Sequence, residues 1–128
     1  MLSPIDIRVE KAKTMPQKKK NADAEMLQGT LDMLILKTLV MGPAHGHTIA
    51  HVIEHTSEDF LQVEQGSLYP ALHRLEDRGW LSSSWGTSEN NRKAKFYELT
   101  PAGKKQLTVE TNRWRQIARA IELVMGER

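Results

Sequence analysis

The spacing of apolar residues predicts two amphipathic helices in the first part of the chain. The first begins near Met26 and ends at Gly42-Pro43, because glycine and proline both interrupt a helix. The second is short and runs from about His47 to Glu54. Each helix is expected to bury one apolar stripe. The stripe residues are Leu31, Leu34, Ile35 and Leu39 in the first helix, and Ile49, Val52 and Ile53 in the second.

A third helix is predicted between Ser67 and Gly79, with sequence signals at both ends. The Ser67 hydroxyl can cap free N–H groups of the first turn. Pro70 is expected in that same turn, where its nitrogen has no helical hydrogen bond to lose. Gly79 suits the left-handed conformation that ends many helices. The apolar stripe of this helix consists of Leu68, Leu72 and Leu75.

After Gly79 the apolar period changes to the two-residue alternation of a strand. Residues 81–85 are the first predicted strand and residues 95–99 the second. Residues 86–93 join them as a polar, positively charged turn. Thr100-Pro101 then caps a long final helix that runs to about Met125.

Apolar residues of the final helix repeat at intervals of seven, which is typical of a coiled coil. The repeat extends over roughly three heptads, which is more than a small domain needs for its own core. We therefore expect this seam to pair with a second copy of the chain. The predicted dimerisation residues are Leu107, Trp114, Ile117, Ala118, Ile121 and Met125.

Three helices, a hairpin and a long helix follow one another in the order of a winged helix-turn-helix. The predicted fold class is mainly α (α+β). In this fold the third helix enters the major groove of DNA and the hairpin is the wing. We expect a disordered, partly basic tail over residues 1–25, a winged helix-turn-helix domain over 26–100, and a C-terminal dimerisation helix over 101–128.

Composition restricts the function classes. The chain has 128 residues, enough for one ordinary domain with a short tail. It contains no cysteine, which excludes disulfides, thiolate metal sites and cysteine nucleophiles. Its 18 Lys and Arg against 16 Asp and Glu give a net charge of only +2, but basic residues cluster locally. This distribution suits a protein that contacts a polyanion with one face.

Enzymatic and membrane functions have little support in the sequence. Ser82-Ser83-Ser84 has no base at a recognisable spacing, and there is neither a glycine-rich phosphate loop nor a carboxylate pair in an apolar setting. The most apolar stretch, residues 33–40, is far shorter than the roughly 20 residues of a membrane span. We expect a cytoplasmic protein that is not an enzyme.

Residues 66–76 (GSLYPALHRLE) resemble the recognition-helix signature of the PadR family of transcriptional regulators. Residues 27–36, 43–46 and 92–103 are also similar to the first helix, the start of the second helix and the wing of that family, so the resemblance covers about residues 26–125. It implies a homodimeric DNA-binding regulator, in which repression is relieved by a small molecule or another signal.

Two regions carry the candidate DNA contacts. Arg74 can donate to phosphate or to guanine, and Tyr69 can donate to phosphate or pack on a base methyl. Cations at the hairpin tip would flank the duplex backbone. The alternative is an ordinary solvated surface. The candidates are Ser67, Tyr69, Pro70, His73 and Arg74 in the third helix, Arg92, Lys93 and Lys95 in the wing, and His45 and Thr48 at the start of the second helix.

Histidines suggest a second hypothesis. His47, His51 and His55 are spaced four residues apart, and a histidine pair at this spacing can bind zinc or nickel. A polar helix face is the simpler interpretation, because no further ligand cluster completes a site. No metal or cofactor is therefore expected, and a metal-responsive regulator stays an alternative.

The sequence as a whole predicts a sequence-specific, homodimeric DNA-binding repressor. Two recognition helices related by a two-fold axis would enter successive major grooves about 34 Å apart, so the operator should be roughly palindromic. The alternative from another class is a winged-helix module that binds protein. Salt distinguishes the two, because DNA binding weakens steeply as salt rises and an apolar contact does not.

Overall fold

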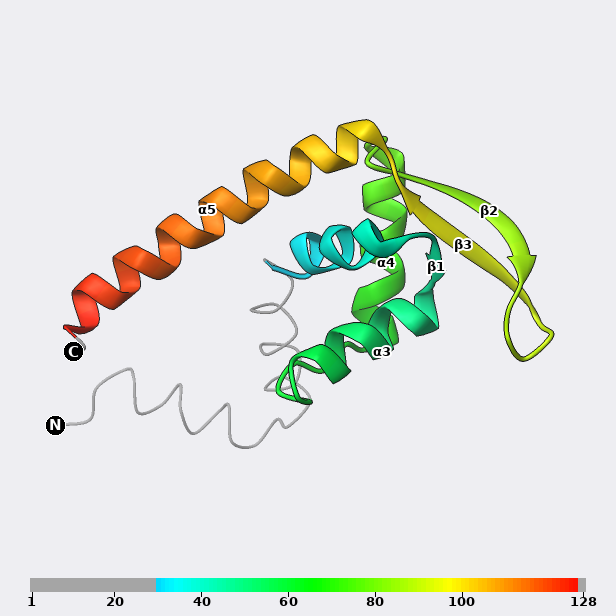
Figure 1. Ribbon diagram of the computed structural model, residues 1–128, viewed down its shortest axis with the longest axis horizontal. Helices are drawn as coiled ribbons and strands as arrows, with labels where there is room; N and C mark the ends of the chain where they lie inside the picture. Colours follow the sequence, from blue (N-terminus) through cyan, green and yellow to red (C-terminus); the bar gives the residue numbers. More distant parts are fainter. Residues whose placement is uncertain (1–29, 127–128) are drawn as a thin grey trace, which may run out of the picture.

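The computed structural model, which describes residues 30–126, consists of a group of helices from which a small antiparallel sheet extends to one side (Figure 1). The predicted tail over residues 1–25 and the first residues of the first predicted helix lie outside this range. Residues 30–38 are helical. The elements that follow are η1 (Leu39–Met41), β1 (Ala44–His45), α3 (Gly46–Thr56), α4 (Gln65–Asp77), β2 (Leu81–Thr87), β3 (Lys93–Leu99) and α5 (Pro101–Met125).

The sheet has the order β1-β3-β2. Strands β2 and β3 form the predicted hairpin, in register from the pair Leu81 and Leu99 to the pair Thr87 and Lys93. Each strand extends two residues further toward the loop than predicted, so only residues 88–92 connect them. We call β2, β3 and this loop the wing. Strand β1 was not predicted, because two residues are too few to show an alternation.

One apolar core holds the domain together. The predicted stripes of the helices are buried at most positions. Strands β2 and β3 contribute Leu81, Tyr97 and Leu99 to the same core. Val52 is an exception, and its predicted burial is wrong: its side chain is 36% exposed. Ile49 and Ile53 face the core from α3, and Val52 lies one position to the side of them. The buried residues are Leu31, Ile35, Leu36, Leu39, Ile49, Ile53, Val63, Leu68, Ala71, Leu72, Leu75, Leu81, Tyr97 and Leu99.

Helix α4 begins two residues before the predicted start. The carbonyl of Glu64 accepts hydrogen bonds from the amides of Ser67 and Leu68, at 3.0 and 2.9 Å, so Ser67 lies within the first turn and is not the N-cap. The predicted place of Pro70 is therefore also wrong, since it lies inside the helix. Proline has no N–H for the Gly66 carbonyl four residues before it. Because Gly66 is exposed, water can supply that bond.

Helix α5 begins as predicted and is fixed to the corner between α4 and β2. The Thr100 hydroxyl accepts a hydrogen bond from the Gly103 amide at 3.0 Å and donates one to the Gly79 carbonyl at 2.7 Å. Pro101 occupies the first turn, and Gly79 has the expected left-handed φ of +80°. Gly103 is buried against the Trp80 carbonyl. These contacts determine the direction in which α5 leaves the domain.

Beyond its first turns, α5 runs away from the rest of the described fold (Figure 1). Leu107 still packs against the core. Further along, Trp114, Ile117 and Ile121 are 47%, 51% and 56% exposed, and Met125 is 65% exposed. The helix therefore presents an apolar face that no other part of residues 30–126 covers. None of the helices in this range has the length and hydropathy of a membrane span.

Candidate nucleic-acid interface

Helix α4 separates its buried stripe from an outward face that carries polar side chains. Leu68, Leu72 and Leu75 are buried, as the helical period requires. Tyr69 and His73 lie on the opposite side and are exposed. Because the leucine face packs against the core, Tyr69 and His73, two of the predicted DNA contacts, point away from it.

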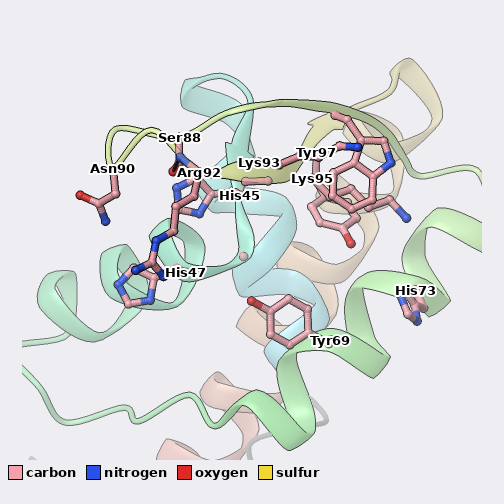
Figure 2. A pocket seen from close by; sticks show the side chains of 13 residues that line it. His45, His47, Tyr69, His73, Ser88, Asn90, Arg92, Lys93, Lys95 and Tyr97 are labelled. Carbon is pink, nitrogen blue, oxygen red and sulfur yellow. Dashed lines mark hydrogen bonds between the residues drawn. The ribbon is translucent and has the colours of Figure 1, made fainter.

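A cleft of about 700 Å³ lies between α4 and the wing. In Figure 2, Tyr69 and His73 rise from α4, and Arg92, Lys93 and Lys95 come from the wing. No carboxylate is among the described residues that line this cleft, so its charge is positive. The full lining is His45, Gly46, His47, Tyr69, His73, Trp85, Ser88, Asn90, Arg92, Lys93, Ala94, Lys95 and Tyr97.

Aromatic rings hold the two wing lysines in place. The Lys93 ammonium lies 5.3 Å from the centre of the Trp85 ring, and the Lys95 ammonium lies 5.6 Å from that of Tyr97. Such cation–π contacts restrict a flexible side chain without neutralising it. Burial raises the pKa of Tyr97, so its phenol stays neutral beside these cations. The two lysine side chains therefore have fewer conformations to lose on binding a phosphate.

Glu76 connects α4 to both strands of the wing. Its carboxylate accepts a hydrogen bond from the Ser83 hydroxyl of β2 and lies 3.4 Å from the Lys95 ammonium of β3. The Ser83 hydrogen bond is the main reason that the pKa of Glu76 is lowered, and Lys95 lowers it further. The carboxylate thus fixes the end of α4 against the hairpin.

Replacing Glu76 with glutamine is expected to lower the free energy of unfolding at pH 7 by about 1 kcal/mol. Because folding lowers the pKa of this carboxyl below its ordinary 4.5, its stabilisation is complete above that pH and is lost as the pH falls through the folded-state value. Urea unfolding should therefore separate wild type and Glu76→Gln at pH 7, and the difference should shrink as the pH falls below 4.5. Asp77→Asn, exposed on the same helix, is the control; an equal loss there would contradict the role of Glu76.

The tip of the wing is a tight loop that aims Arg92 into the cleft. The Ser88 hydroxyl accepts a hydrogen bond from the Arg92 amide at 3.3 Å, and the Ser88 amide donates to the Arg92 carbonyl at 2.7 Å. Asn91 adopts a left-handed φ of +61°, a conformation that asparagine tolerates well. Figure 2 shows the Arg92 side chain reaching toward His47 at the start of α3.

His45 forms the other edge of the cleft. It precedes the first turn of α3, and its Nε2 lies 3.2 Å from the Thr48 hydroxyl. Its ring packs edge-on against Phe96, with centroids 5.4 Å apart, and stacks with His47 at 6.4 Å. The pairing of β1 with β3 places His45 opposite Phe96 and so brings the start of α3 to the wing.

The structure gathers some of the nominated DNA contacts and leaves others apart. His45, Tyr69, His73, Arg92, Lys93 and Lys95 all line the cleft. Ser67, Pro70, Thr48 and Arg74 are not among the lining residues. The Arg74 guanidinium donates to the carboxylate of Asp32 at 2.7 Å, in the helix over residues 30–38. A DNA contact at any of these ten residues stays a prediction.

Several lining residues were not nominated from the sequence. Trp85 lies directly opposite Lys95 in the hairpin, and Tyr97 follows on the same face of β3. The two-residue alternation of the strands is a signal that would have placed these aromatic residues beside the lysines. Gly46 and His47 reach the cleft through the pairing of β1, for which the sequence has no comparable signal.

The histidines of α3 do not form one continuous ligand row. His51 and His55 stack at 5.9 Å, whereas His47 stacks on His45 outside the helix. Within residues 30–126 no group of three or more histidine, aspartate and glutamate side chains is arranged to hold a metal ion. The arrangement of these histidines therefore gives no support to the metal-binding hypothesis that their spacing suggested.

Comparison with known proteins gives a consistent answer. Residues 35–109 match the Transcriptional regulator PadR-like family. The chain is 31% identical over 97 residues to the transcriptional regulator Rv3488 of Mycobacterium tuberculosis, covering 76% of this chain and 87% of that protein. A transcriptional regulator from Clostridium thermocellum has a similar structure, with a TM-score of 0.70, 26% identity and coverage of 77% and 95%. A PadR family transcriptional regulator from Eggerthella lenta also has a TM-score of 0.70, with 25% identity and coverage of 91% and 100%.

Proposed function

Because the chain belongs to the PadR-like family of transcriptional regulators, which bind DNA and are not enzymes, we propose that it is a cytoplasmic, homodimeric repressor that reads a palindromic operator. The family establishes transcriptional regulation with a winged-helix fold. Repression, dimerisation, the operator and relief by a signal are our proposals. They rest on the arrangement of α4, the wing and α5.

The cleft between α4 and the wing is the observation that carries the proposal. Its cations come from the wing, while α4 offers side chains that can donate to phosphate or contact base edges. In a winged helix the recognition helix occupies the major groove, so the wing lies along the adjacent backbone. Arg92, Lys93 and Lys95 would then supply binding energy that does not depend on sequence. Specificity would come from Tyr69 and His73.

The apolar face of α5 supports the proposed dimer. Pairing two copies of α5 would bury Trp114, Ile117, Ile121 and Met125, each about half exposed or more in one chain. Such a two-fold pairing buries the same face of both copies. It would also present two α4 helices to one side of a duplex. Half-sites about 34 Å apart and an inverted repeat follow from that symmetry.

An apolar groove supports the proposal that a small molecule relieves repression. The groove, of about 670 Å³, lies between the helix over residues 30–38 and α5, and is lined by Met33, Leu34, Leu107 and Trp114 among others. It adjoins the face proposed for dimerisation, so an apolar ligand there would act on the position of α5. Release of a bound operator duplex by such a compound, and retention of the duplex by a Met33→Ala variant, which changes the groove but not the α5 face proposed for dimerisation, is the test.

Selection of bound oligonucleotides from a random pool tests the function as a whole. We expect an enriched inverted repeat whose two halves are separated by one helical turn. Binding of that duplex should fall steeply as salt rises. Enrichment of a single, unrepeated half-site would contradict the dimeric arrangement. No enrichment, together with salt-insensitive binding of a protein partner, would favour the protein-interaction module instead.

Replacing Arg92 and Lys93 together with alanine should weaken binding on the order of 10-fold near 0.1 M salt, for specific and non-specific duplexes alike. Loss of two phosphate contacts should also lower the slope of log affinity against log salt by roughly 2. Fluorescence anisotropy at several salt concentrations measures both quantities. Lys104→Ala with Lys105→Ala removes the same charge outside the cleft and should have less effect. Selective loss of sequence discrimination would contradict the assigned role.

A further inference from the structure

We infer that Gly46 is a positioning residue for DNA binding, whose missing side chain lets the Tyr69 ring lie at the floor of the cleft. This inference rests on the proposed function. A Cβ atom at Gly46 would lie 2.8 Å from Tyr69 Cε1, 2.9 Å from its hydroxyl oxygen and 3.0 Å from Cζ. Real Cβ atoms do not approach other heavy atoms so closely. The ring therefore occupies space that only glycine leaves free.

The position of Gly46 is fixed by the fold around it. It is the first residue of α3 and is buried. It directly follows β1, whose Ala44 and His45 pair with Tyr97 and Phe96 of β3. The backbone on which the Tyr69 ring rests is thus held by the same strand that forms half of the wing. The pairing of β1 with β3 therefore determines how closely the Tyr69 ring can approach the backbone at the start of α3.

The ring is the component that must move when a side chain is added. Tyr69 is 38% exposed, and Figure 2 shows its hydroxyl end directed toward the start of α3. A methyl group at Gly46 would push the ring several tenths of an ångström or more into the cleft, where the DNA is proposed to lie. Because hydrogen bonds weaken steeply with distance and angle, the hydroxyl would lose its contact with the duplex.

Among the described glycines, a Cβ at Gly86 would also crowd an aromatic ring, that of Phe96, but only at Gly46 is the crowded ring that of Tyr69. A Cβ at Gly66, within α4 itself, would meet no heavy atom within 4 Å. At Gly46 the three nearest atoms all belong to the one side chain that α4 directs into the cleft. Gly46 also has no positive φ, so backbone strain is not the reason for glycine here. Space for Tyr69 is the reason that remains.

A double-mutant cycle tests the inference. The four proteins are wild type, Gly46→Ala, Tyr69→Ala and the double variant, and the probe is a labelled duplex carrying the palindrome enriched by selection. We expect Gly46→Ala to weaken binding about 10-fold in the presence of Tyr69, the size of one hydrogen bond to a charged group. In the Tyr69→Ala background the same substitution should change affinity less than about 2-fold, because no ring remains to be displaced.

Urea unfolding of the same four proteins shows whether a loss of affinity is due only to lower stability of the variant. If Gly46→Ala also lowers stability, removal of the Tyr69 ring should restore it, which supports the same contact. An equal effect of Gly46→Ala on affinity in both backgrounds, or no effect in either, would overturn the inference while leaving the proposed function intact. Failure of the wild type to bind any duplex would overturn the proposed function, and this inference with it.

Discussion

Replacing Ile117 and Ile121 with glutamate is expected to yield a monomer that binds the palindromic duplex at least roughly 100-fold more weakly than wild type. Both side chains are about half exposed in one chain and would be buried in the proposed dimer. A carboxylate in an apolar interface loses its hydration without gaining a partner. Once the copies separate, the second half-site no longer benefits from the high effective concentration that a linked dimer provides.

Sedimentation of the free protein and anisotropy of the labelled duplex measure the two effects. Gln116→Glu with Ala120→Glu is the matched control, because it adds the same charge at the same spacing on exposed positions outside the apolar seam. The control should stay dimeric and keep its affinity. A dimeric Ile117→Glu, Ile121→Glu variant would show that the copies pair through another surface.

Replacing Gly103 with alanine should lower the free energy of unfolding by about 3 kcal/mol, an overpacking cost at a site that cannot relax. An added Cβ would overlap the Trp80 carbonyl oxygen and lie 2.8 Å from a Leu99 methyl. The Trp80 carbonyl is backbone and already accepts a hydrogen bond from the Thr100 amide at 3.1 Å. Relief of the contact therefore requires α5 to move away from the domain.

Urea unfolding of Gly103→Ala beside Gly66→Ala separates this clash from the general effect of the substitution. Gly66 is also helical, but a Cβ there meets nothing. Alanine at Gly66 should leave stability unchanged or raise it by up to about 1 kcal/mol, because alanine favours helices. Equal stability of the two variants would show that α5 is not held at its start.

The elements that carry long periodic patterns could be predicted from the sequence. Leu68, Leu72 and Leu75 repeat over about two turns, and Thr100-Pro101 combines a capping hydroxyl with a proline that suits the first turn of a helix. Short or locally ambiguous elements could not. Strand β1 exists only because β3 offers it a partner, and the start of α4 depends on the Glu64 carbonyl rather than on the Ser67 hydroxyl.

The candidate site shows the same division. Positions on a helix face follow from the helical period, so the buried positions of Leu68 and Leu72 already imply that Tyr69 and His73 are exposed. Contacts between elements distant in sequence carry no such signal. The ion pair of Arg74 with Asp32 joins residues 42 positions apart, and the contact of Gly46 with Tyr69 depends on the sheet register. Both are determined by tertiary packing.

A single residue, Thr100, separates the end of β3 from the start of α5. The corner formed by Thr100, Gly79 and Trp80 is therefore the pivot that sets the angle between the wing and the 25-residue helix α5. A helix of this length spans about 37 Å, so a tilt of about 5° at the pivot carries its far end through about 3 Å. In the proposed dimer, a change in the angle between the two α5 helices would change the distance between the two α4 helices, and so would change which operators the pair can fit.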